Sequence, residues 1–233
     1  MEEKTASLKK TARLAGLLYL IMSIPAPYAL IYVPSKIIVH GNAEATANNL
    51  IANEFLFRTG IVCQLFSQTV FIFLVLVLYR LFKIVNEHQA KLMVALVMVS
   101  IPIAFLMEAF NLTSLMILKG EVQKTLALEQ QQDLAMLFLK IHGYGIMIVQ
   151  IFWGLWLLPF GQLVYKSGFI PRVLGVLLIL AGIAYVIDSF TFLLFPGYSA
   201  FVNQYTFPFY FGELAIILWL LIKGTKAPAI SST

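Results

Sequence analysis

Charged residues are scarce in this sequence. Only 12% of its 233 residues are Asp, Glu, Lys or Arg, whereas 61% are hydrophobic. Soluble domains carry about 25% charged and about 45–50% apolar residues. So little polar material cannot cover the surface of a soluble domain of this length, which excludes an ordinary soluble fold. The composition instead indicates one integral membrane domain over residues 1–233.

Cysteine is almost absent, since Cys63 is the single one and lies within an apolar segment. One cysteine cannot form an intrachain disulfide, and the three histidines add no spacing typical of a zinc module. The sequence also lacks a phosphate-cradling glycine loop and a nucleophile elbow. It therefore requires no cofactor, and whether the protein is an enzyme stays open.

A basic run with interleaved aromatic residues is lacking as well. The net charge is +5, but the lysines and arginines stand at the ends of apolar segments rather than together. This placement is typical of membrane topology signals and argues against nucleic-acid binding. The expected partner is the lipid bilayer.

Long apolar segments are what the sequence does have. A helix needs about 20 apolar residues to cross a hydrocarbon core of about 30 Å, and six segments reach that order of length. We therefore predict an all-α membrane protein with six transmembrane helices in one bundle. The predicted spans are 12–33, 55–82, 91–118, 134–165, 172–195 and 207–223.

The basic residues predict an orientation. With the N-terminus inside, the cytoplasmic side collects eleven Lys and Arg and the outer side five, which favours two cytoplasmic termini in the cell membrane. The inner set is Lys4, Lys9, Lys10, Arg13, Arg80, Lys83, Lys91, Lys166, Arg172, Lys223 and Lys226, and the outer set is Lys36, Arg58, Lys119, Lys124 and Lys140.

Two connecting regions carry local structure signals. In residues 42–54, Asn42 can cap a helix, and apolar residues follow at helical spacing. We predict a short amphipathic helix on the outer surface there. Between the fourth and fifth spans, Gly168 ends one helix and Pro171 starts the next.

Small residues recur at near-heptad spacing on the fourth and fifth spans. Such stripes let helices approach closely, so the two spans are expected to form a tight antiparallel hairpin. The stripes are Gly143, Gly154 and Gly161 on one helix and Gly175, Gly182 and Ser189 on the other.

Three stretches carry a family resemblance. Residues 165–190, 212–224 and 13–21 resemble the bacterial membrane proteins grouped as domain of unknown function 4386, and the likeness extends over most of the chain. It implies a bacterial multi-pass membrane protein of about this length. It brings no catalytic or ligand-binding residues to this chain, so the functional argument depends on the residues themselves.

Ionisable residues within the predicted spans are the main functional signal. Each costs about 2.5–3.5 kcal/mol to insert and usually faces the bundle interior or a water-filled cavity. Counted from the inner charges, the three carboxylates lie at the midplane and in the outer half, which predicts one polar site opening outward. The candidate members are Glu108, His142, Asp188 and Glu213, with Asn111, Gln150 and Arg58 as secondary members.

Close carboxylates in a low-dielectric site cannot all stay ionised, so some are protonated or a cation such as Arg58 lies between them. Binding or proton/cation-coupled transport of a small solute is the leading interpretation. A second is a metal-dependent intramembrane enzyme, with His142, Glu108, Asp188 and Glu213 as candidate metal ligands. A network that only fixes helix packing, or a scaffold subunit, remains a further alternative.

Overall fold

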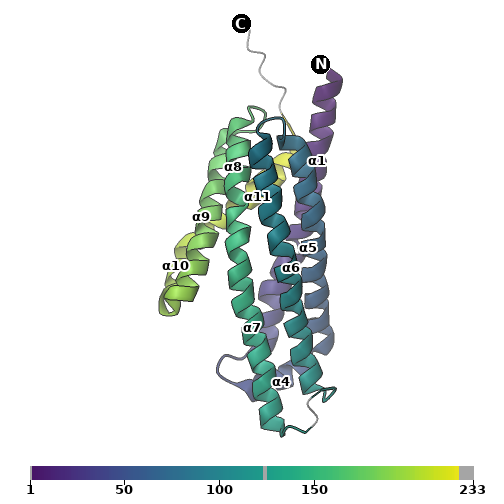
Figure 1. Cartoon of the computed structure of the whole chain (residues 1–233), viewed down its shortest axis with the longest axis vertical. Helices are drawn as coiled ribbons and strands as arrows, with labels where there is room; N and C mark the ends of the chain where they lie inside the picture. Colours follow the sequence, from purple (N-terminus) through teal and green to yellow (C-terminus); the bar gives the residue numbers. More distant parts are fainter. Residues whose placement is uncertain (1, 123–124, 226–233) are drawn as a thin grey trace. The chain divides into compact units, whose positions relative to one another are not determined.

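The computed structural model describes residues 2–122 and 125–225, and within them the chain is helical without a strand (Figure 1). This confirms the predicted all-α class. The elements are α1 (Glu2–Ser23), α2 (Pro25–Pro27), η1 (Tyr28–Tyr32), α3 (Val33–Ile37), α4 (Ala43–Ala52), α5 (Glu54–Phe82), α6 (Glu87–Leu118), α7 (Leu128–Leu155), α8 (Leu157–Lys166), α9 (Arg172–Leu194), η2 (Pro196–Tyr198), α10 (Ser199–Thr206), η3 (Phe207–Tyr210) and α11 (Phe211–Ile222).

In the described part of the chain, six helical stretches are long and apolar enough to cross a membrane. They match the six predicted spans in order and indicate a multi-pass membrane protein. The fourth has 39 residues and is about 58 Å long, more than a hydrocarbon core of about 30 Å requires. The stretches are Ala6–Ile37, Glu54–Phe82, Glu87–Leu118, Leu128–Lys166, Arg172–Leu194 and Pro196–Ile222.

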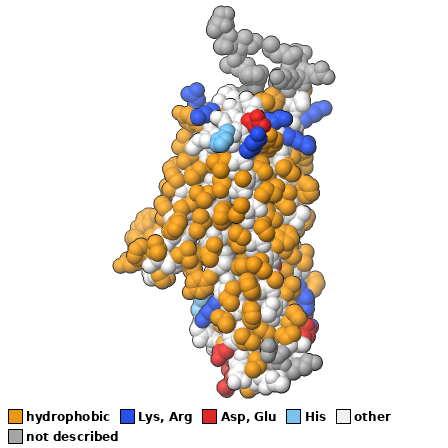
Figure 2. Space-filling view, in the orientation of Figure 1, with side chains coloured by type: hydrophobic (Ala, Val, Ile, Leu, Met, Phe, Trp, Pro, Cys, Tyr) orange, Lys and Arg blue, Asp and Glu red, His pale blue; other side chains and the backbone are white. Residues whose placement is uncertain are grey.

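The surface of the described residues exposes many large apolar side chains. Large apolar side chains such as Phe55, Ile24 and Val62 are mostly exposed, and Figure 2 shows hydrophobic side chains over most of the visible face. Soluble monomers rarely expose contiguous apolar patches larger than a few hundred Å². The exposed side chains therefore support the membrane assignment independently of helix length.

Three of the six stretches, the first, the fourth and the sixth, are divided into shorter helices. The sequence analysis predicted each of them as one continuous span. Proline explains each break, because it donates no backbone hydrogen bond. Pro25 and Pro27 precede the π-helix η1, and Pro159 cannot donate to the carbonyl of Leu155 where α7 gives way to α8. Pro208 lies in η3, between α10 and α11.

The chain forms two compact units. Unit 1 comprises residues 1–20, 70–100 and 147–233. Its interior is aromatic: Trp156 packs edge-on against Phe71, with ring centroids 5.0 Å apart, and stacks on Phe160 at 5.3 Å. Tyr19 and Phe82 join the same group of rings. These contacts tie α1, α5 and α8 together within the unit.

Also in unit 1, the predicted hairpin of the fourth and fifth spans is confirmed. A Cβ built on Gly154 would lie 2.6 Å from the carbonyl oxygen of Gly182, and one on Gly161 equally close to that of Gly175. The helices therefore touch backbone to backbone, and Gly168 turns the chain between them with a φ of 72°. Gly143 is different, because a Cβ there would meet open space.

Unit 2 comprises residues 21–69 and 101–146. Its core joins α3, α4, α5, α6 and α7 through Val33, Ile37, Leu50, Phe57, Ile61, Leu115 and Leu139. The predicted short helix is α4, and its predicted cap is confirmed because Asn42 Oδ1 accepts a hydrogen bond from the Ala45 amide at 2.8 Å. Its buried face contains Thr46, Ala47 and Leu50, whereas the apolar Ile51 is exposed.

We expect Asn42→Ala to destabilise α4 by about 1 kcal/mol, because it removes the side-chain acceptor at the helix N-terminus. Amide hydrogen exchange over residues 43–52 measures the effect. Asn42→Ser, which restores an acceptor, should leave protection near the wild-type level. Equal exchange in the Ala and Ser variants would contradict the capping role.

Candidate functional site

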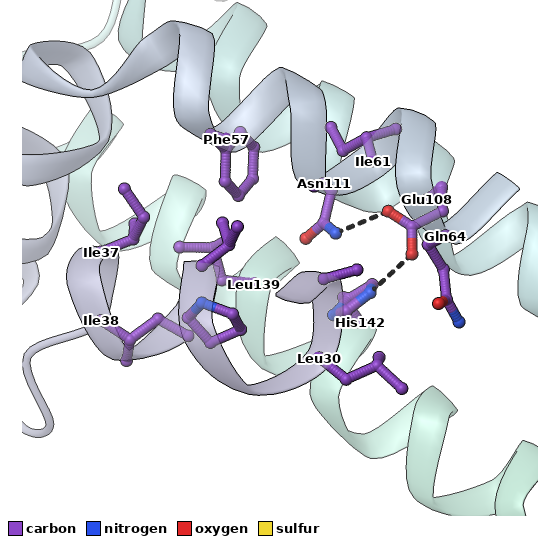
Figure 3. A pocket seen from close by; sticks show the side chains of 14 residues that line it. Leu30, Ile37, Ile38, Phe57, Ile61, Gln64, Glu108, Asn111, Leu139 and His142 are labelled. Atoms are coloured by element: carbon purple, nitrogen blue, oxygen red, sulfur yellow. Dashed lines mark hydrogen bonds and ion pairs between the residues drawn. The ribbon is translucent and has the colours of Figure 1, made fainter. Parts of the chain in front are cut away.

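Unit 2 contains a partly open cavity of about 40 Å³. One side is apolar and includes Leu30 of η1 and Ile37 of α3. The other side is polar, with Gln64 from α5, Glu108 and Asn111 from α6 and His142 from α7 (Figure 3). A cavity holds a water molecule when it offers about 10–15 Å³ or more, so this one admits a few waters or a small ion.

Glu108 is the centre of the polar side. It is 3% exposed, and each of its oxygens has a partner: Asn111 Nδ2 donates to Oε2 at 2.9 Å, and His142 Nε2 lies 3.1 Å from Oε1. Residues three apart on a helix share a face, which places Asn111 beside Glu108. The contact between Glu108 and His142 is one hydrogen bond, and the tautomer of His142 decides which partner donates it.

Gln64 is the unusual residue of this cavity. It is 2% exposed, and neither its amide oxygen nor its amide nitrogen has a hydrogen-bond partner among the described residues. An unpaired buried amide costs about 1–3 kcal/mol. Gln64 and Glu108 both line the cavity (Figure 3), so its wall contains a carboxyl group and an amide with unused hydrogen-bonding capacity.

The cavity lining contains no lysine or arginine among the described residues. Arg58, predicted as a cation for the polar site, instead pairs with Glu54 one turn earlier on α5, with Nε and Oε1 2.7 Å apart. Lys119 reaches the same oxygen at 3.1 Å. The three charges form an exposed group, which leaves Glu108 as the only carboxylate on the cavity wall.

Asp188 lies in unit 1 and has partners of its own. It is 6% exposed and accepts hydrogen bonds from Thr206 Oγ1 at 2.7 Å, from Asn203 Nδ2 at 3.1 Å and from the Tyr210 hydroxyl. All three donors belong to α10 and η3. The carboxylate therefore holds α10 and η3 against α9 through these hydrogen bonds.

Glu213, at the start of α11, lies against tyrosines of the same unit. It accepts a hydrogen bond from the Tyr19 hydroxyl of α1, and Tyr185 of α9 is its second partner. Tyr185 stacks on Tyr210 with ring centroids 4.2 Å apart and planes 15° apart. Gln150 Nε2 donates to the Tyr185 carbonyl at 3.3 Å, so Gln150 supports the backbone beside this group.

The structure thus places the predicted site residues in two groups. Glu108, Asn111 and His142 meet in unit 2, whereas Asp188, Glu213 and Gln150 belong to unit 1. No group of three or more His, Cys, Asp or Glu that could hold a metal ion is present in residues 2–122 and 125–225. The candidate metal ligands are therefore not gathered into a metal centre.

Sequence reasoning did not select several residues of these groups. Gln64 lies on a polar stripe of α5 with Ser67 and Gln68, and nothing in that pattern separates it from the other two. A tyrosine, threonine or asparagine is a weak signal of a polar site in a sequence, because the carboxylate that it contacts can lie on another helix. The unselected donors to the two carboxylates of unit 1 are Tyr19, Tyr185, Asn203, Thr206 and Tyr210.

Comparison with known families supports the resemblance. The profile of the family described as "Domain of unknown function (DUF4386)" matches residues 14–224, nearly the whole chain. The chain belongs to the DUF4386 family. No solved structure matches this DUF4386 chain significantly.

One curated relative of this DUF4386 member is an "Uncharacterized protein" of Archaeoglobus fulgidus. The two are 42% identical over 99 residues, which cover 40% of this chain and 58% of the relative. The chain thus spans less than two thirds of the relative's length. Since the relative is archaeal, the bacterial origin implied by the resemblance stays a prediction, as does the arrangement of the six spans in one bundle.

Proposed function

We propose that this DUF4386 protein binds a small monovalent cation in the cavity of unit 2, as a step in moving that ion or a small solute across the membrane. The observation that carries the proposal is Gln64. Its amide has no hydrogen-bond partner among the described residues, and Gln64 lines the same cavity as the Glu108 carboxyl group. Buried polar groups in folded proteins are normally hydrogen-bonded, so an unpaired one needs an explanation. A bound ligand that pairs with the Gln64 amide is such an explanation.

Charge selects a cation as the ligand. Glu108 contributes a negative charge when ionised, and the described lining holds no lysine or arginine to oppose it. The amide oxygens of Gln64 and Asn111 add neutral acceptors of the kind that coordinate hard cations. An anion would face Glu108 without a positive partner, which is unfavourable at short range in a low-dielectric site.

Size and ligand number favour a monovalent ion. A volume of about 40 Å³ leaves room for an ion with little of its hydration shell. Calcium takes six to eight oxygen ligands, commonly from several carboxylates, and zinc takes at least three nitrogen, sulfur or carboxylate ligands. One carboxylate, one histidine and two amides fit Na⁺, K⁺ or NH₄⁺ better.

Cation-dependent thermal unfolding of the detergent-purified protein tests this proposal. Chlorides of Na⁺, K⁺ and NH₄⁺ are compared with choline chloride at equal ionic strength. We expect at least one small cation to raise the Tm of the wild type, because a ligand at a hundredfold excess over its Kd stabilises the folded state by about 2.7 kcal/mol.

The matched variants are Gln64→Leu and Gln68→Leu, which change the same residue type one turn apart on α5. Gln68 is also buried but does not line the cavity. We expect Gln64→Leu to lose the cation-dependent shift and Gln68→Leu to keep it. A wild-type Tm that does not distinguish small cations from choline would reject the proposal, and so would an equal shift in both variants.

The proposal also includes the orientation of the chain in the membrane and its contact with lipid. We propose that both termini are cytoplasmic in the cell membrane, on the strength of the Lys and Arg asymmetry, and that lipid covers the exposed apolar side chains. Two of the residues counted, Lys124 and Lys226, lie outside the described part of the chain. Accessibility of cysteines introduced at residues 88 and 119 from either side of the membrane checks the orientation.

A further inference from the structure

Unit 1 contains a second group of ionisable residues, which the cation proposal does not use. Asp188 of α9 and Glu213 of α11 are joined through two stacked tyrosines: Tyr210 hydrogen-bonds Asp188, and Tyr185 hydrogen-bonds Glu213. The two acids therefore belong to one connected cluster, although they are 25 residues apart in the sequence.

The partners of both carboxylates are neutral donors. Asp188 accepts from Asn203, Thr206 and Tyr210, and Glu213 from Tyr19 and Tyr185. The ion pairs found among the described residues include neither acid. The titratable groups that face Glu213 are Tyr19 from α1 and Tyr185 from α9, and η3 adds Tyr210 to the cluster.

A buried carboxylate without a cation is costly to keep ionised inside a membrane protein, because its charge loses hydration on burial. Asp188 accepts three hydrogen bonds, one of them from Thr206 at 2.7 Å. Glu213 has only phenolic hydroxyls as donors and no charged partner among the described residues, so Glu213 is the acid that we expect to hold a proton.

We propose that this cluster is a proton-binding site, with one exchangeable proton on Glu213. The ligand is a proton that converts the Glu213 carboxylate into a carboxylic acid. The site is built from residues of unit 1, none of which lines the cavity of unit 2. An exchangeable proton on a carboxyl group within a candidate membrane span is what proton-coupled movement of a solute requires.

Infrared spectroscopy of the purified protein in lipid tests the assignment, because a protonated carboxylic acid has a carbonyl band that a carboxylate lacks. The experiment uses a Glu108→Gln background, which removes the buried acid of unit 2. We expect an acid carbonyl band at neutral pH in this background and its loss when Glu213→Gln is added. Absence of the band from the background protein, or its survival after Glu213→Gln, overturns the proposal.

Two further variants keep the test decisive if Glu213→Gln folds poorly. Tyr19→Phe removes a hydroxyl partner of Glu213, so the acid band should shift in frequency while the fold is kept. Tyr185→Phe removes the other hydroxyl partner of Glu213, so the acid band should shift in this variant as well. A band that neither variant moves belongs to another residue and rejects the site.

Discussion

Alanine in place of Gly154 or Gly182 is expected to destabilise the protein by about 2–3 kcal/mol. A Cβ at either position would lie 2.6 Å from the carbonyl oxygen of the other glycine, closer than atoms of these types approach. The obstacle is backbone rather than a flexible side chain, so the helices must move apart. Inserting a methyl group into a tightly packed site costs about 1–3 kcal/mol.

Gly143→Ala is the matched control, because Gly143 lies on α7 with Gly154 but faces open space. Alanine is favoured over glycine in a helix interior by about 0.5–1 kcal/mol, so this variant should be neutral or slightly more stable. Thermal unfolding in one detergent measures all the variants. Similar losses at Gly143 and Gly154 would show that close approach is not what the glycine at 154 provides.

The double variant Gly154→Ala/Gly182→Ala gives an independent check. Both substitutions open the same helix crossing, so the first should relieve most of the clash for the second. We expect the combined loss to be smaller than the sum of the single losses, as is common for residues in direct contact. Full additivity would indicate that the two glycines act at separate contacts.

Asp188→Ala is expected to destabilise the protein by about 3 kcal/mol and to loosen α10. The change leaves Asn203, Thr206 and Tyr210 without their common acceptor, and an unpaired buried donor costs about 1–3 kcal/mol. The loss stays below the sum for three donors because the Thr206 hydroxyl also donates to backbone carbonyls. Asp188→Asn, which keeps one acceptor oxygen, should lose less.

Hydrogen exchange over residues 199–210, measured with thermal unfolding, tests this expectation. Exchange there should rise in Asp188→Ala, because the donors to Asp188 are the residues that hold α10 and η3 against α9. Asp133→Ala is the control, since Asp133 is an exposed acid on α7 and surface changes stay within about 0.5 kcal/mol. Unchanged exchange in the Asp188→Ala variant would contradict the fastening role.

Two residues of the same type show where prediction from sequence reaches its limit. Gln64 and Gln68 lie one turn apart on a stripe that the sequence marks as polar, and both are buried. Only Gln64 lines the cavity with Glu108. The register of α5 against α6 and α7 decides between them, and a pattern within a single helix does not contain that register.

The carboxylates show the same limit. Asp188 and Glu213 were identifiable because a charge in an apolar run is conspicuous whatever the fold. Their tyrosine and threonine partners were not, because those residue types are common in membrane helices without such a role. Arg58 was assigned to the wrong partner for a related reason, since Glu54, four residues before it, meets it within the same helix.

What the sequence by itself determined is therefore local. The apolar lengths define the six spans because the bilayer sets how much apolar helix is needed, and Asn42 caps α4 because its acceptor serves the adjacent turn. Only the tertiary structure decided that Gly154, not Gly143, touches α9, and that Gln64 lines the same cavity as Glu108. Those outcomes depend on distances between helices, and such distances come from the packing of whole helices rather than from any one segment.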